Sequence, residues 1–147
     1  MISTVVLAGG QGLRLWPLSS PEHPKPFLRL PGHDRTLLAE TLLRCSRLNK
    51  ASGPLIVGAL SHAALLRAEA RPIAPNAKFL LETEPRGTAP AICAAALLLL
   101  RDGRDAPMLV LPSDHVIDGE DAFAAAVAHG ATLAADGLLV TFSVVPT

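Results

Sequence analysis

The N-terminal part of the chain is a short apolar segment that runs directly into a glycine-rich loop. Residues 2–8 have the length and composition of a buried strand, and three glycines then occur within residues 9–12. Glycine allows positive φ angles and lets backbone N–H groups come close to a ligand. Consecutive N–H groups form an anion-binding concavity, and Arg14 adds a positive charge beside it. The loop therefore predicts a polyphosphate site, the alternative being an ordinary strand-to-loop turn.

Two familiar glycine loops do not fit this segment. A Walker-type phosphate loop ends in Gly-Lys-Ser/Thr, whereas Gly12 is followed by Leu13. A dinucleotide fingerprint that starts at Gly10 needs a third glycine at the position of Leu15. The missing glycine argues against a nicotinamide-dependent dehydrogenase.

Composition excludes several classes of protein. The 147 residues allow one domain, and their net charge of zero gives no support for binding to nucleic acid or an acidic membrane surface. The longest apolar run, residues 89–100, is shorter than the roughly 20 residues that span a bilayer, and no basic segment precedes the first apolar run. Cys45 and Cys93 are both expected to be buried free thiols. We therefore expect no membrane segment and a cytoplasmic location.

Strand-like and helix-like segments alternate along the rest of the chain. After an irregular loop over 19–31, helices are expected over 37–48, 62–70, 88–101 and 121–135, and strands over 55–57, 78–82, 108–111 and 138–145. Thr36, Ser61 and Thr88 are candidate N-caps, and Gly137 is expected to end the last helix. The alternation predicts an α/β fold with a mainly parallel sheet and helices on both faces.

Three marked segments follow strands of this expected sheet. They are residues 9–14 after the first strand, 82–90 after the third and 113–115 after the fourth. Ligands of such folds bind at the carboxyl ends of the strands, so we expect the three segments to converge on one site.

Several motifs in these segments resemble those of one enzyme family. GGQGLRLWPL at residues 9–18, followed by Lys25-Pro26-Phe27, resembles the sugar-1-phosphate nucleotidyltransferases. TAPAI at 88–92, SDHVI at 113–117 and TFSVVPT at 141–147 are similar to the mannose-1-phosphate guanylyltransferase branch, as is Trp16. The resemblance implies a Rossmann-like nucleotidyltransferase core that transfers GMP from GTP to mannose 1-phosphate and releases pyrophosphate.

The resemblance also implies roles for three charged residues. Arg14 would bind the β- and γ-phosphates, since its planar fork suits phosphate oxygens. Lys25 would act as a point charge near the α-phosphate. Asp114, at the end of a buried strand, would bind Mg²⁺, which usually takes one or two protein carboxylates together with phosphate oxygens. The alternatives are ordinary surface cations and a carboxylate that caps the next helix. His115 has no predicted role, and the histidine spacing does not indicate zinc.

Base recognition is assigned to the end of the third strand. Related uridylyl and thymidylyl enzymes place a base-reading glutamine there, and Glu82 could accept hydrogen bonds from the ring N–H and amino group of guanine; Glu84 is the rival. The residues expected to contact the nucleotide are Leu7, Ala8, Gly9, Gly10, Gln11, Gly12, Leu13, Arg14, Lys25, Glu82, Arg86, Gly87, Thr88, Ala89, Pro90 and Ser113.

The sequence departs from the branch at three positions and at its end. Leu13, Pro26 and Gly87 stand where the branch usually has Thr, Gln and Asn. Family members also continue beyond residue 147 into segments that bind the sugar phosphate and supply a second metal carboxylate. We therefore expect residues 1–147 to be the nucleotide-binding lobe without the sugar-phosphate part, with impaired turnover.

An unfinished sheet edge would favour homo-oligomers, because exposed strand edges pair with other chains. Two further functions remain open. One is a nucleotidyltransferase for another sugar 1-phosphate that uses UTP or dTTP, and the other is a non-catalytic module that binds nucleotide or a partner subunit.

Overall fold

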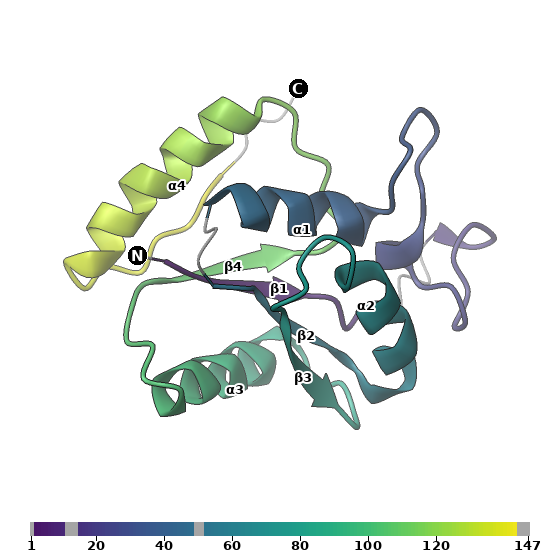
Figure 1. The fold of residues 1–147 in the computed structure, drawn as a ribbon, viewed down its shortest axis with the longest axis horizontal. Coiled ribbons are helices and arrows are strands. Elements are labelled where there is room, and N and C mark those ends of the chain that lie inside the picture. Colours follow the sequence, from purple (N-terminus) through teal and green to yellow (C-terminus); the bar gives the residue numbers. More distant parts are fainter. Residues whose placement is uncertain (1, 11–14, 49–51, 144–147) are drawn as a thin grey trace.

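The centre of the structure, a computed structural model that describes residues 2–10, 15–48 and 52–143, is a parallel four-stranded sheet (Figure 1). The strands lie in the order β3-β2-β1-β4, so β1 has a neighbour on each side. Their bounds are Ser3–Leu7 for β1, Leu55–Ala59 for β2, Lys78–Glu82 for β3 and Met108–Pro112 for β4. The α/β fold expected from the alternating pattern is confirmed.

Helices cover both faces of this sheet (Figure 1). Their bounds are Leu37–Leu48 for α1, Ala63–Ala70 for α2, Thr88–Arg101 for α3 and Glu120–Ala135 for α4. Successive side chains of a strand point to opposite faces. Val6 therefore packs in the cluster that contains α1, α2 and α4 residues, whereas its neighbour Val5 packs against α3.

Local sequence signals account for the first helix. Thr36 accepts a hydrogen bond through Oγ1 from the backbone N–H of Ala39 at 3.1 Å, which confirms the predicted N-cap. Leu38, Leu42 and Cys45 then form one fully buried stripe that faces the sheet. Burying each leucine contributes about 1.5–3 kcal/mol, so packing supplies most of the stability of α1.

Two predicted helix caps are wrong. The short 3-10 helix Leu60–His62 precedes α2, and His62 takes the N-cap position without a side-chain hydrogen bond, so Ser61 does not cap α2. Gly87 takes the N-cap position of α3 with φ of 93°, a left-handed conformation that favours glycine. Thr88 is therefore the first helical residue of α3.

The expected burial of both cysteines is half right. Cys45 is buried in the core, but Cys93 is exposed. The reason is that α3 buries a narrow stripe, Ala91, Ala95 and Leu99, against the sheet. Cys93 lies on the opposite side of the helix from that stripe.

The expected strand over 138–145 is wrong in its described part, because residues 138–143 form no strand. This apolar segment runs beside α4 instead (Figure 1). Its contacts are with the helix: a Cβ built on Gly130 of α4 would lie 2.8 Å from the ring of Phe142 and 3.4 Å from Val140. Apolar contact with α4 replaces pairing with the sheet. Residues 144 and 145 lie outside the described part of the chain.

The proline-rich loop over 19–31 is irregular apart from the 3-10 helix Lys25–Phe27, which anchors it by burying Pro26 and Phe27. Of the strands in the described residues, β3 and β4 are the edges of the sheet, and self-association through such an edge stays a prediction. Within residues 2–10, 15–48 and 52–143, the helices are too short or too polar to cross a bilayer.

Candidate functional site

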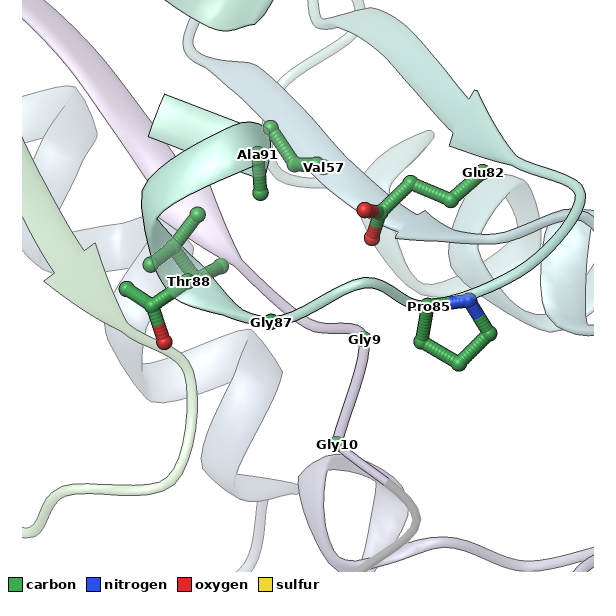
Figure 2. A pocket seen from close by; sticks show the side chains of 9 residues that line it. Gly9, Gly10, Val57, Glu82, Pro85, Gly87, Thr88 and Ala91 are labelled. Atoms are coloured by element: carbon green, nitrogen blue, oxygen red, sulfur yellow. The ribbon is translucent and has the colours of Figure 1, made fainter. Parts of the chain in front are cut away.

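The carboxyl ends of β1, β2 and β3 surround a cavity of about 220 Å³ (Figure 2). Strand register explains why these ends meet, since Leu7 of β1 pairs with Val57 of β2 and Ala59 of β2 pairs with Glu82 of β3. The glycine loop and the start of α3 complete the wall. The lining residues are Leu7, Gly9, Gly10, Val57, Glu82, Pro85, Gly87, Thr88 and Ala91.

The carboxylate of Glu82 lies directly against the glycine loop. A Cβ built on Gly9 would be 3.2 Å from Oε2 of Glu82, which is tighter than ordinary contact. Figure 2 shows the Glu82 carboxylate turned into the cavity on the side of Val57. The absence of a side chain at Gly9 therefore lets an acceptor of two hydrogen bonds stand in the cavity wall.

The first turn of α3 forms the opposite wall. Gly87 and Thr88, at the start of this helix, line the cavity together with Ala91. The first backbone N–H groups of a helix have no partner within the helix, and this end carries a partial positive charge. The cavity thus has the Glu82 carboxylate on one wall and the positively polarised end of α3 on another.

Lys25 and Asp114 form an ion pair near this region. Nζ of Lys25 donates to Oδ2 of Asp114 at 2.8 Å, although 89 positions separate the two residues in the sequence. The two side chains are 30% and 33% exposed, so both remain accessible to a ligand. The backbone N–H of Ser113 donates to the carbonyl of Leu7 at 3.0 Å, which holds the Asp114 segment beside β1.

Asp114 is compatible with a metal that uses few protein ligands. Within the described ranges, no three His, Cys, Asp or Glu residues are grouped closely enough to enclose a metal ion. A single accessible carboxylate suits Mg²⁺, which keeps several waters and takes phosphate oxygens as further ligands.

Some of the predicted nucleotide-contact residues line the cavity and others do not. Leu7, Gly9, Gly10, Glu82, Gly87 and Thr88 line the cavity. Ala8 and Ser113 are buried, whereas Arg86, Ala89 and Pro90 are exposed and outside the lining. The rival Glu84 is exposed and lies 3.6 Å from Arg86. Gln11, Gly12, Leu13 and Arg14 lie outside the described residues, so the predicted role of Arg14 stays a prediction.

Three lining residues carry no chemical signal in the sequence. Val57, Pro85 and Ala91 are apolar and supply shape. Val57 lines the cavity because it pairs with Leu7 on the adjacent strand, and this pairing is known only from the strand order in the structure.

Residues 3–147 match the model of the Nucleotidyl transferase family, and the chain belongs to this family. It is 45% identical over 145 residues to the xanthan biosynthesis protein XanB of Xanthomonas campestris, covering 97% of this chain and 30% of the relative. It is 43% identical over 146 residues to the mannose-1-phosphate guanylyltransferase RfbM of Salmonella typhimurium, with coverage of 97% and 30%.

A solved structure shares the fold. It is described as mannose-1-phosphate geranyltransferase from Thermus thermophilus, and it matches with a TM-score of 0.79 and 37% identity over 92% of this chain and 39% of that chain. The chain thus spans about a third of the length of the curated relatives that it matches.

Proposed function

We propose that this chain is the nucleotide-binding lobe, residues 1–147, of a mannose-1-phosphate guanylyltransferase that transfers GMP from GTP to mannose 1-phosphate. Relatives such as RfbM, which is named for this activity, support the proposal. The observation that carries it furthest is the Glu82 carboxylate in the cavity wall beside Gly9. A carboxylate can accept from the ring N–H and the amino group of guanine together, whereas uracil and thymine offer no such pair of donors.

The size of the cavity also supports the proposal that it holds the guanine base. At about 220 Å³ it is smaller than the roughly 300–1,000 Å³ of pockets that enclose drug-sized ligands. It is suited to a base rather than to a whole nucleoside triphosphate. The triphosphate would extend from the cavity along the glycine loop, with the predicted Arg14 beside its β- and γ-phosphates.

In the proposed reaction, an oxygen of the sugar phosphate forms a bond to the α-phosphorus of GTP. The bond from that phosphorus to the bridging oxygen breaks, and pyrophosphate leaves with the electron pair. The protein need not provide a nucleophile, because holding two anions in line and neutralising their charge lowers the barrier. Lys25 would exchange its contact with Asp114 for one with the α-phosphate.

Asp114 is the residue that would hold Mg²⁺. The metal would neutralise phosphate charge and thereby favour attack on phosphorus. The ammonium of Lys25 lies 2.8 Å from the Asp114 carboxylate and balances its charge. In the proposed complex, Mg²⁺ would take over this balance and Lys25 would contact the α-phosphate.

Fluorescence of the sole tryptophan offers a direct test. Trp16 is 79% exposed and follows the glycine loop, so it should report nucleotide bound there. GTP, ATP, UTP and dTTP are titrated with and without Mg²⁺, and calorimetry repeats any silent titration. We expect a Mg²⁺-dependent response that favours GTP. A preference for UTP or dTTP would indicate another nucleotidyltransferase, and nucleotide binding without pyrophosphate release at saturating substrates would indicate a non-catalytic module.

Glu82→Gln tests the proposed base contact. The amide keeps the size of the side chain but turns one acceptor into a donor, which faces a donor of guanine. Hydrogen bonds to charged groups contribute about 1.5–3 kcal/mol, so GTP affinity should fall about 10- to 100-fold while UTP affinity is kept. Glu84→Gln is the matched control, because the exposed Glu84 lies outside the cavity lining. Equal losses in the two variants would contradict the assignment.

A further inference from the structure

A second cavity, of about 160 Å³, is lined by loop residues between 30 and 35, by residues of α1 between 37 and 44, and by the segment that joins β4 to α4 together with the first residue of α4. This segment rises beside α1 in Figure 1, where it is drawn in green. Among the residues that the structure describes, none lines both cavities. Its walls carry the charged or ionisable residues His33, Arg35, Glu40, Arg44, His115, Asp118 and Glu120.

Arg44 is the feature of this cavity that needs an explanation. The residue is only 6% exposed, and its Nε has no hydrogen-bond partner in the part of the chain that the structure describes. Its guanidinium carbon lies 5.6 Å from the centre of the Phe123 ring, which offers no charge to balance it. Burial lowers the pKa of Arg44, consistent with a cation removed from water. A buried cation is costly unless an anion accompanies it.

The neighbouring carboxylates already have other partners. Glu40 lies 3.5 Å from Arg35, although its charge also raises the pKa of Arg44 against the effect of burial, and Glu120 is paired with Arg47. Asp118, the remaining carboxylate of the cavity wall, is exposed, so water screens its charge. Among the described residues, no carboxylate oxygen lies within ion-pair distance of Arg44.

We propose that this second cavity binds a small phosphate-bearing anion, with Arg44 as its buried anchor and His33 and His115 at its rim. The planar fork of an arginine matches two oxygens of a phosphate, and the two histidines are exposed and available as additional donors. The small volume restricts the ligand to inorganic phosphate or a compact phosphomonoester. The proposal goes beyond nucleotidyl transfer, and it would give the protein a second site for a phosphorylated metabolite.

Thermal unfolding in inorganic phosphate at constant ionic strength tests this proposal. Phosphate at about 100 times its Kd should raise the Tm of the unaltered protein by about 5–10 °C and leave that of Arg44→Met unchanged. Without phosphate, Arg44→Met should be at least as stable as the parent, because it removes an unpaired buried charge and keeps a side chain of similar length. A parent protein whose Tm does not respond to phosphate would overturn the proposal.

Arg67→Met is the matched control. Arg67 also stacks on a phenylalanine, with its guanidinium 5.7 Å from the centre of the Phe79 ring, but it is exposed on α2 and does not line the second cavity. Its replacement should leave the phosphate response intact. Equal loss of the phosphate response in both arginine variants would overturn the proposal, because only Arg44→Met is expected to lose the site.

Two further variants keep the test informative if Arg44→Met does not fold. His115→Ala, at an exposed position, should weaken phosphate binding about two- to tenfold, the effect of one lost hydrogen bond. Lys25→Met, in the candidate nucleotide site, should lose GTP affinity and keep the phosphate response. A phosphate response that disappears in Lys25→Met and persists in His115→Ala would assign phosphate to the nucleotide site and overturn the second one. Failure of GTP binding alone would leave the second site unaffected.

Discussion

The substitution Gly9→Ala should change nucleotide selectivity without changing stability, because Gly9 lies against the carboxylate of Glu82. The new Cβ would lie 3.2 Å from Oε2 of Glu82 and 3.9 Å from Cα of Gly58. Only the first of these distances is tight, and it involves the far end of a flexible side chain. Gly9 is not among the glycines with positive φ, so alanine can adopt its backbone conformation. The carboxylate, rather than the strand, should therefore move.

The expected effect on GTP follows from this displacement. The Glu82 carboxylate must shift by a few tenths of an ångström, which lengthens two hydrogen bonds that are each worth about 1.5–3 kcal/mol. Losing about 1 kcal/mol in total weakens GTP binding about fivefold. UTP has no matching pair of donors, so its affinity should not change. The free energy of unfolding should stay within about 0.5 kcal/mol of the parent.

Calorimetric titration of GTP and UTP into the parent, Gly9→Ala and Gly10→Ala measures this effect as the ratio of the two affinities. Gly10→Ala is the control, since a Cβ there lies within 4 Å of no atom of the described residues outside its chain neighbours. Any loss of phosphate binding in the loop would affect both nucleotides equally and leave the ratio intact. An unchanged ratio in Gly9→Ala would refute the proposed role of the carboxylate. A large fall in Tm would refute the expectation that only a side chain moves.

Two further predictions concern the scaffold. Gly53→Ala should destabilise the fold by about 2–3 kcal/mol and lower the Tm by about 5–10 °C, because its Cβ would overlap backbone atoms of Asn76 that cannot move independently; thermal unfolding that matches the parent would contradict this packing. In a thiol-labelling assay at pH 8, only the exposed Cys93 should react in the folded protein. Burial raises the pKa of Cys45 to about 12 and so keeps this residue as the unreactive thiol. Labelling of both thiols before denaturant is added would contradict the burial of Cys45.

Most elements of the fold could be predicted from local sequence signals. The bounds of β3 and α3 agree with the expected ranges 78–82 and 88–101, and Thr36 caps α1 as its position before the leucine pattern indicates. Such signals depend on residues a few positions apart. The prediction of a strand over 138–145 was wrong in its described part. A short apolar run indicates that the segment needs an apolar contact, but it does not indicate whether a strand or a helix supplies that contact.

The chemistry of the candidate site was partly visible in the sequence. Gly9 follows one expected strand and Glu82 ends another, whereas the base-reading role of Glu82 is what the resemblance to related nucleotidyltransferases implies. The structure brings the two residues together in one wall. Lys25 and Asp114 were assigned separately, and their ion pair could not be foreseen across 89 positions. Arg44 gave no signal at all, since an arginine at that position of an amphipathic helix is usually exposed.

The sequence by itself therefore determined the four strands of the sheet, the four helices around it and the positions that bear charge or lack a side chain, but not the conformation of residues 138–143. These properties follow from hydrophobic periodicity, backbone freedom and side-chain chemistry, which depend only on residues close together in the sequence. Only the tertiary structure decided that β3 lies beside β2 and β2 beside β1, and hence that Glu82 reaches Gly9. It also decided that Arg44 is buried with no carboxylate oxygen of the described residues within ion-pair distance. Strand order and burial depend on which distant surfaces pack together, so they are properties of the whole assembled sheet and its covering helices.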